Sequence, residues 1–292
     1  MRDVVFSVII PAYNRVDLLR RCLESLEQQT YTAFEVLVVD DCSNEDIRTV
    51  VEGIKLPSLF YYRLEKNTGG GGARDYGVER ATGDYVAFLD SDDYWLPSRL
   101  EVLNSEISRA ETKPECIISG MRVKKTNGVF VEPKLKPSNK MKVFDSILLD
   151  GCSVQTSGFV LSWSVSRFVR FDASLKKHQD LDLYVQIDKH GIEPLYLDDR
   201  NVVWDISHEG GSISRNKKLN VSVDWVISVK EKVSAASYLV FCSRFIAPSA
   251  SGLREILDIY PRLSSGMNLY EKANMYASAL FWYVIGKLRA VF

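Results

Sequence analysis

Short apolar runs alternate with segments of helical periodicity from Val4 to Arg109. Apolar runs that end at a polar residue or a proline are typical of buried strands, and apolar residues spaced three or four apart are typical of amphipathic helices. The predicted strands are Val4–Ile10, Phe34–Val39, Phe60–Arg63 and Tyr85–Leu89, and the predicted helices are Arg15–Gln29, Asn44–Gly53, Ala73–Ala81 and Pro97–Arg109, with Thr68–Gly72 as a loop. This alternation predicts an α/β fold with a parallel, doubly wound sheet.

The pattern becomes less regular beyond residue 115. The predicted strands here are Glu115–Lys124, Val129–Val131, Gly158–Ser162 and Asn201–Ile206, and the predicted helices are Val143–Asp150, Leu181–His190, Asn220–Ala247 and Leu269–Leu288. Asn127-Gly128 is a typical hairpin turn between the first two of these strands. Pro248 and Pro261 lie in the segment between the last two helices, which is expected to be irregular.

Composition excludes several classes of protein. The 292 residues are 46% hydrophobic and 26% charged, as in an ordinary globular protein, and the net charge of -1 gives no reason to expect nucleic acid as a partner. Five widely spaced cysteines without a C-x-x-C pair argue against a disulfide framework or a zinc site and fit a reducing cytoplasm. No stretch reaches the ~20 apolar residues of a membrane-spanning helix, and Val4–Ile10 is interpreted as a strand rather than a signal sequence.

The C-terminal part of the chain differs in charge from the rest. From Ser214 onward there are eleven Lys and Arg residues against five Asp and Glu, so this part has a net charge of +6. Ala273–Gly286 is uncharged and is followed by Lys287 and Arg289. An aromatic, apolar helix with cations at its end is expected either to lie on an anionic membrane surface or to pack on the rest of the protein or another subunit.

Three carboxylates follow the predicted strand Tyr85–Leu89, namely Asp90, Asp92 and Asp93. Carboxylates so close together repel one another unless a cation lies among them, and Mg²⁺ and Mn²⁺ prefer oxygen ligands. Open α/β sheets bind ligands at the carboxyl ends of their strands. The cluster therefore indicates a metal–diphosphate site, although a D-x-D string on its own favours a solvated acidic turn, because Asp is common in turns.

Other predicted strands also end in polar groups. Tyr13 and Asn14 follow the first strand after Pro11, and Asp40-Asp41 ends the second. Between Asn67 and Arg74 stand four glycines, which allow a backbone to approach a ligand closely. The chain contains neither G-x-G-x-x-G nor G-x-x-x-x-G-K-[ST], which disfavours a dinucleotide-binding enzyme or a P-loop enzyme.

Four motifs in this order resemble family 2 glycosyltransferases of the GT-A fold. They are S-V-I-I-P-A-Y-N-R at 7–15, V-V-D-D-C-S at 38–43, N-x-G-x-x-x-A-R-D at 67–75 and G-D-Y-V-A-F-L-D-S-D-D at 83–93. The resemblance implies a GT-A domain with a donor-binding half at 1–115 and an acceptor-binding half at 116–215. A C-terminal helical extension would follow at 216–292.

The resemblance also implies roles for particular residues. The nucleotide-sugar would be bound by Pro11, Ala12, Tyr13, Asn14, Asp40, Asp41, Asn67, Gly69, Arg74, Asp90, Ser91 and Asp92. Asp92 would bind Mn²⁺ or Mg²⁺, with Asp90 and His208 as further candidate ligands. Asp93, Trp95 and Gln179 are candidates for contacts with the donor sugar or the acceptor, and a core role for Trp95 fits its sequence at least as well.

The family takes its catalytic base from a Glu-Asp pair before an amphipathic helix. Here Gln179 stands in place of the glutamate, which leaves Asp180 as the candidate base and Asp182 as its competitor. The base would remove the proton from the acceptor hydroxyl as that oxygen attacks the anomeric carbon. The structural alternative is that Asp180 caps the following helix.

The expected activity is inverting, metal-dependent transfer from a UDP-sugar to a hydroxyl of a lipid-linked or polysaccharide acceptor during surface glycan synthesis. The protein is expected in the cytoplasm, and the apolar C-terminal helix suggests peripheral attachment to the membrane. A non-catalytic nucleotide-sugar-binding subunit and a sugar nucleotidyltransferase are the alternatives. A nucleotidyltransferase would carry a basic Gly-rich loop after the first strand, where this chain has Ala12-Tyr-Asn-Arg15.

Overall fold

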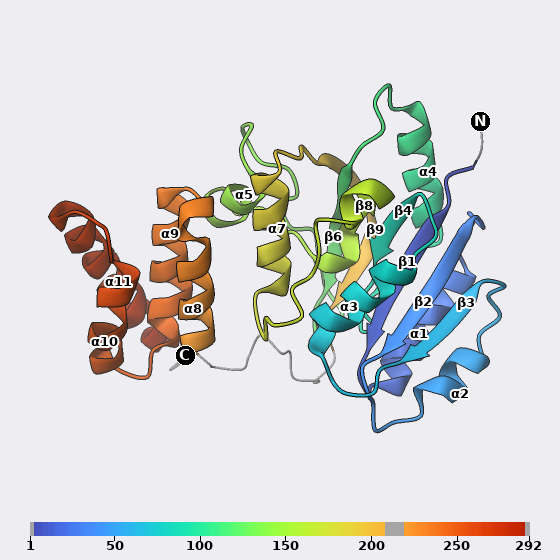
Figure 1. Ribbon diagram of the computed structural model, residues 1–292, viewed down its shortest axis with the longest axis horizontal. Helices are drawn as coiled ribbons and strands as arrows, with labels where there is room; N and C mark the ends of the chain where they lie inside the picture. The colour runs from blue at the N-terminus through green and yellow to red at the C-terminus, as the bar shows by residue number, and fades with distance from the viewer. Residues whose placement is uncertain (1–2, 208–218, 290–292) are drawn as a thin grey trace. The chain divides into compact units, whose positions relative to one another are not determined.

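The computed structural model describes residues 3–207 and 219–289 (Figure 1). The chain divides into two compact units. An α/β unit contains residues 1–137 and 152–209, and a helical unit contains residues 138–151 and 210–292. The segment 138–151 thus belongs to the helical unit, whereas the sequence placed it within the second half of the catalytic domain.

The described part of the α/β unit contains one mixed sheet with the strand order β3-β2-β1-β4-β8-β6-β9-β5, and β7 pairs with β6. The strands are β1 (Phe6–Ala12), β2 (Phe34–Asp40), β3 (Leu59–Arg63), β4 (Tyr85–Phe88), β5 (Tyr94–Trp95), β6 (Cys116–Lys124), β7 (Phe130–Val131), β8 (Phe159–Ser162) and β9 (Leu195–Asp205). The first four strands are mutually parallel, as predicted. Strand β8 runs antiparallel to both β4 and β6 and joins the parallel half to the rest of the sheet.

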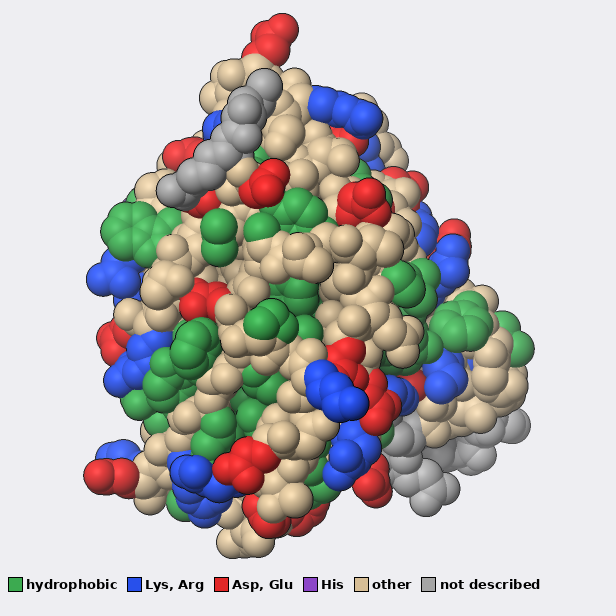
Figure 2. Space-filling model, turned by 90° about the vertical axis from the view of Figure 1, so that its right-hand side faces the viewer, with side chains coloured by type: hydrophobic (Ala, Val, Ile, Leu, Met, Phe, Trp, Pro, Cys, Tyr) green, Lys and Arg blue, Asp and Glu red, His purple; other side chains and the backbone are tan. Residues whose placement is uncertain are grey.

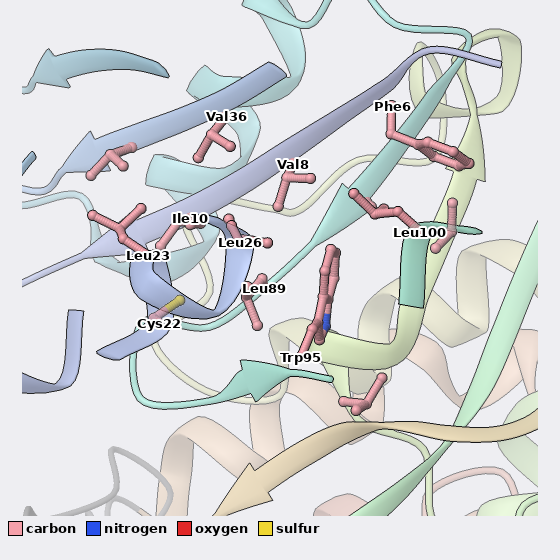
Figure 3. Packing of buried hydrophobic residues seen from close by; sticks show 14 of the residues in the cluster. Phe6, Val8, Ile10, Cys22, Leu23, Leu26, Val36, Leu89, Trp95 and Leu100 are labelled. Atoms are coloured by element: carbon pink, nitrogen blue, oxygen red, sulfur yellow. The ribbon is translucent and has the colours of Figure 1, made fainter. Parts of the chain in front are cut away.

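Helices pack on both faces of the parallel strands. They are α1 (Val16–Glu27), α2 (Ile47–Glu52), α3 (Gly69–Arg80), α4 (Arg99–Arg109), α6 (Trp163–Ser166) and α7 (Gln179–Lys189), with a 3-10 turn at Thr156–Gly158. Alternate β1 residues point to opposite faces. Val8 and Ile10 therefore lie in one cluster with Leu23 and Leu26 of α1 (Figure 3), while Ile9 lies on the other face against Gly77 of α3.

Several elements of the α/β unit differ from the sequence prediction, among them the short helix α6, which the sequence did not predict. Helix α3 begins at Gly69, so the predicted loop Thr68–Gly72 is largely helical. Glycine disfavours helices, but a Cβ on Gly71 would lie 2.8 Å from the Gln179 side chain, and close packing overrides propensity here. Strand β9 begins at Leu195 rather than Asn201, and the two-residue strand β5 was not predicted.

The helical unit contains α5 (Val143–Leu149), α8 (Leu219–Val229), α9 (Ala235–Phe241), α10 (Leu253–Leu263) and α11 (Leu269–Arg289), with shorter helical turns at Lys230–Lys232, Cys242–Ile246 and Ala247–Ser249. Asp145 ties α5 to the start of α9 by accepting hydrogen bonds from Ser234 Oγ at 2.7 Å and Ser237 Oγ at 2.5 Å. Helix α10 was not predicted. Its apolar face is regular, but Pro261 was interpreted as a helix breaker although it lies in the last turn.

Charged side chains of both signs are interspersed on the face drawn in Figure 2, in keeping with the nearly neutral net charge. In the described residues, no helix is long and apolar enough to cross a bilayer.

Candidate functional site

Asp90, Asp92 and Asp93 form a carboxylate cluster between β4 and β5. One carboxylate oxygen from each of these residues lies within 4.8 Å of the others. Asp90 and Asp92 are partly exposed, whereas Asp93 is buried. The cluster follows the carboxyl end of β4, beside β1, where the sequence placed a ligand site.

Two arginines pair with the two partly exposed carboxylates. Arg15 Nη1 donates to Asp92 Oδ2 at 2.8 Å, and Arg74 of α3 donates to Asp90. The Arg74 guanidinium lies 5.0 Å from the centre of the Phe171 ring, and its buried Nε has no hydrogen-bond partner among the described residues. The site therefore combines carboxylates with guanidinium groups, the side chains suited to a cation and to a diphosphate respectively.

Asp93 is enclosed by protein atoms and does not present its carboxyl to a ligand. It accepts hydrogen bonds from Ser157 Oγ at 2.5 Å and from the Asp205 backbone N–H at 3.0 Å. Burial, with Asp90 and Asp92 nearby, raises the pKa of Asp93 well above its usual range. Asp93 thus anchors the cluster to β9 and to the 3-10 turn, instead of contacting sugar hydroxyls as proposed from the sequence.

Trp95 is also a core residue. Its side chain is 2% exposed, and Nε1 donates to the Ser157 carbonyl at 2.9 Å. Of the two roles that the sequence left open for Trp95, stacking on a sugar or packing in the core, the structure shows the core role, because the ring is covered.

The second strand ends in two carboxylates that brace neighbouring loops. Asp40 accepts hydrogen bonds from Tyr61 Oη and Arg63 Nη1, each at 2.7 Å, and from the Ser43 N–H at 2.8 Å. Asp41 accepts hydrogen bonds from the backbone N–H groups of Thr68 and Gly69 and so holds the start of α3. Both carboxylates are buried and hold the loops that follow β2 and β3 in place.

The loop after β1 is braced in a similar way. Asn14 Oδ1 accepts a hydrogen bond from the Asn44 N–H at 2.9 Å, and the Asn14 N–H donates to Ser43 Oγ at 2.8 Å. Tyr13, by contrast, is 47% exposed, so its ring is available to a ligand.

The other residues predicted to bind the nucleotide-sugar lie around the loop after β1. Pro11 and Ala12 end β1, and Ser91 lies inside the carboxylate cluster. Asn67 Nδ2 donates to the Asp41 carbonyl at 3.1 Å, and Gly69 contacts Asp41 through its N–H. The candidate metal ligand His208 lies outside the described residues.

Residues with positive φ gather around this edge of the sheet. Asn14, Arg15 and Cys42 follow β1 and β2, and His178 precedes α7, with φ angles of 56°, 63°, 63° and 65°. Such angles are uncommon outside glycine and cost of order 1–3 kcal/mol each. They are retained where the surrounding structure enforces them, and they accompany functional sites often enough to support one here.

Asp180 lies in the first turn of α7, one residue beyond the start of the helix, so it is not the helix cap. It is partly exposed as a residue, but its carboxyl lies deep enough that desolvation raises its pKa, and the nearby Asp90 adds to this effect. Arg74 and the backbone N–H groups of the helix start act in the opposite direction. A carboxylate with a raised pKa beside the carboxylate cluster has the properties of a general base.

The neighbours of Asp180 distinguish it from its competitor. Asp182 accepts a hydrogen bond from Gln186 Nε2 at 2.9 Å, one turn along the helix. Gln179 packs against Gly71, and its amide donates to the Leu175 carbonyl at 2.5 Å. The hydroxyl of Tyr184 is buried, has no hydrogen-bond partner among the described residues, and interacts electrostatically with Asp180 and Asp90.

Sequence reasoning missed four residues of the site. Arg15 lies in the motif at 7–15, but no role was predicted for it there. Ser157, Arg21 and Asp205 lie in segments without a recognised motif. Arg21 of α1 donates to the Asp92 carbonyl and to the Asp205 carboxylate. These contacts join parts of the chain as far apart as α1 and β9, and a single sequence carries no local signal for such pairs.

The donor set fits a hard divalent cation. Asp90 and Asp92 offer partly exposed carboxylate oxygens, and Mg²⁺ typically binds one or two carboxylates together with substrate phosphates. The described cluster contains no thiolate or imidazole, the ligands that softer metals prefer.

Comparison with known proteins identifies the family. Residues 7–158 match the model of the family "Glycosyl transferase family 2". The amylovoran biosynthesis glycosyltransferase AmsB of Erwinia amylovora is 31% identical over 239 residues, which cover 79% of each chain. The amylovoran biosynthesis glycosyltransferase AmsE of the same organism is 43% identical over 123 residues, covering 41% of this chain and 45% of its own.

Solved structures share the fold. S. aureus TarS 1-349 in complex with UDP-GlcNAc superposes with a TM-score of 0.70 at 19% identity, covering 95% of this chain and 89% of its own. The mannosyltransferase PcManGT from Pyrobaculum calidifontis, in complex with GDP-Man and Mn²⁺, gives a TM-score of 0.60 at 15% identity over 98% and 85% of the two chains. With this fold, the match to the family model and the carboxylate cluster after β4, the chain belongs to glycosyltransferase family 2.

Proposed function

We propose that the protein transfers a sugar, with inversion at the anomeric carbon, from a UDP-sugar to a hydroxyl of a lipid-linked or polysaccharide acceptor. The observation that carries this proposal is the placement of Asp180, with its raised pKa, beside the cluster of Asp90 and Asp92. Direct displacement by an acceptor oxygen needs a base on one side of the anomeric carbon and charge stabilisation on the other. A single displacement of this kind inverts the configuration.

Each group has a distinct part in this proposal. Asp92, with Asp90, would hold Mn²⁺ or Mg²⁺, which supplies positive charge to the diphosphate as the nucleotide leaves. Arg15 and Arg74 would add charge-assisted hydrogen bonds to the phosphate oxygens. Tyr13 would stack on the base. Asp180 would accept the proton of the acceptor hydroxyl, and the Tyr184 hydroxyl would donate a hydrogen bond within the same site.

The names of the related proteins bear on the biological process and on the sugar donor. AmsB and AmsE are named for amylovoran biosynthesis, and TarS was solved with UDP-GlcNAc. These names support surface polysaccharide synthesis and a UDP-sugar for this chain. The alternative is a non-catalytic nucleotide-sugar-binding subunit, but the carboxylate cluster and the candidate base are both present.

The proposal is tested by nucleotide release from a panel of UDP- and GDP-sugars with Mn²⁺ or Mg²⁺, and again with EDTA. We expect slow hydrolysis of one UDP-sugar that requires the metal, because water can replace the acceptor at low efficiency. Metal-independent binding of a UDP-sugar without release would favour the binding subunit. If no donor is bound or hydrolysed, the proposed activity is wrong.

We further propose that α11 lies on the anionic inner surface of the cell membrane. One side of this helix exposes apolar residues over several turns; they are Tyr270, Ala273, Ala277, Leu280, Phe281 and Val284. Its other side packs within the helical unit, where Trp282 lies under the Arg244 guanidinium and Gly286 meets Pro248. An apolar stripe on a basic segment is the pattern of an interfacial helix.

Exchanging Phe281 and Val284 for serine is expected to weaken binding to vesicles by at least about tenfold, because each buried apolar side chain contributes ~1.5–3 kcal/mol. Binding is measured by co-sedimentation with phosphatidylcholine vesicles that contain or lack phosphatidylglycerol. Salt should weaken the binding to the anionic vesicles. Phe60→Ser, at an exposed phenylalanine of β3, is the matched control. Equal sedimentation of all three proteins would refute the membrane proposal.

A further inference from the structure

A pocket of ≈ 290 Å³ lies on one face of the strands β5, β9, β6 and β7. It is lined by Tyr94, Leu96, Arg122, Phe130, Glu132 and Val203. The strand register explains why these residues meet. Tyr94 pairs with Val203 and Val203 pairs with Arg122, so the three side chains form one row across the sheet.

The lining is apolar and aromatic, with a balanced polar rim. Val203 is buried and forms the floor, while the rings of Tyr94 and Phe130 stand on two different strands. Arg122 Nε pairs with Glu132 Oε1 at 3.2 Å, and both side chains are about half exposed. Because the arginine is balanced by the glutamate, the pocket offers no net positive charge to a phosphate.

The residues that line the pocket are linked to the carboxylate cluster through the chain and through Arg21. The segment from Asp90 to Trp95 runs from the end of β4 to β5, so Tyr94 follows Asp93 by one residue. Arg21 joins the two places, since it donates to the Asp92 carbonyl and lies 5.0 Å from the centre of the Tyr94 ring. Asp205, which pairs with Arg21, lies two residues beyond Val203, a distance of ~7 Å along a strand.

The position separates this pocket from the nucleotide site. Tyr13 and Arg74 come from the loop after β1 and from α3, on the parallel half of the sheet, whereas β5 and β9 form the opposite edge. In the sequence, the carboxylate cluster comes after Tyr13 and Arg74 and directly before β5. The pocket is therefore separate from the proposed nucleotide site and lies on the part of the sheet beyond the carboxylate cluster.

We propose that this pocket binds one pyranose unit of the acceptor glycan, next to the unit that carries the attacking hydroxyl. The inference rests on the proposed function. Ligand pockets are mostly apolar and aromatic with a few polar groups, and ~300 Å³ is at the lower end of their range, enough for a single sugar ring. The C–H face of the sugar would pack on Tyr94 and Phe130, and its hydroxyls would bond to Arg122 and Glu132.

The test uses saturation-transfer NMR with methyl pyranosides of glucose, galactose, mannose, N-acetylglucosamine and N-acetylgalactosamine. UDP and Mg²⁺ are present so that the donor site is filled. The variants are Phe130→Ala and, as a matched control, Val131→Ala, which changes the neighbouring side chain on the opposite face of β7. At least one pyranoside should bind the wild-type protein, and Phe130→Ala should weaken its binding by about tenfold, because it removes one of the two rings that would cover the apolar face of the sugar.

The inference is overturned if no pyranoside binds, or if Phe130→Ala and Val131→Ala have equal effects on binding. Donor hydrolysis is measured on the same three proteins and should be unchanged, because neither residue lies in the donor site. If the wild-type protein hydrolyses no donor, the proposed function is wrong. Sugar binding is a separate result, which tests the pocket alone.

Discussion

Replacing Asp180 with asparagine is expected to lower the rate of sugar transfer by ~10²–10⁴-fold, the usual contribution of a positioned general base. Asparagine has nearly the same shape but accepts no proton at neutral pH. Donor binding should be preserved, since Asp180 lies on α7 and the proposed nucleotide contacts come from other elements. The measurement is kcat for transfer, together with the Kd of the UDP-sugar.

The pH profile gives an independent test of the same residue. Burial and Asp90 raise the pKa of Asp180, and Arg74 partly opposes them. A base works in its deprotonated form, so kcat should fall as the pH decreases through this raised pKa, above the usual range of an aspartate. In Asp180→Asn this acidic limb should vanish from the residual activity.

Asp182→Asn is the matched control, two residues along the same helix. Its carboxylate bonds to Gln186, and its loss should leave kcat within a few-fold of wild type. The opposite ranking, with Asp182→Asn inactive and Asp180→Asn active, would move the base to Asp182. Equal activity of both variants would remove the base from α7 altogether.

Asp92→Asn is expected to lower donor hydrolysis and transfer by ~10²–10³-fold at limiting Mn²⁺, comparable to the loss of one charge-stabilising group. The substitution removes a charged ligand from the cluster and breaks the ion pair between Arg15 and Asp92. Since the main defect is metal affinity, high Mn²⁺ concentration should restore part of the activity. The measurement is the rate of nucleotide release as a function of Mn²⁺ concentration.

The control for this variant is Asp17→Asn, which removes an exposed carboxylate from the first turn of α1. It should show the wild-type dependence on Mn²⁺. If nucleotide release by Asp92→Asn depended on Mn²⁺ concentration as it does in the wild-type protein, Asp92 would not be a metal ligand. The proposal that the cluster binds the nucleotide through a metal held by Asp92 would then be wrong.

The elements of the parallel half were predictable because each has a strong local signal. β1, β2 and β4 are mostly apolar runs, and α1 has an unambiguous apolar stripe. Helix α3 was misassigned at its start because four glycines suggest a loop in any local interpretation. The deciding contact, Gly71 against Gln179, joins residues more than one hundred positions apart.

The residues of the candidate site also fall into two groups, those with a local sequence signal and those whose environment depends on distant contacts. The carboxylates of the cluster were found from their spacing, because three acidic residues at a strand end are a local pattern. The burial of Asp93 was not foreseeable, since it depends on Ser157 and Asp205 from distant elements. Local sequence indicated which groups gather at this edge, and tertiary packing decided which of them face a ligand.

The left-handed residues around the site bear on how this protein would evolve. Asn14, Arg15, Cys42 and His178 occupy backbone conformations in which glycine is the least strained residue. Selection for heat resistance alone would favour glycine at these positions, because one substitution relieves backbone strain there. At Arg15 that gain would remove the guanidinium beside Asp92, so resistance to heat and turnover of substrate would be in conflict at a single codon.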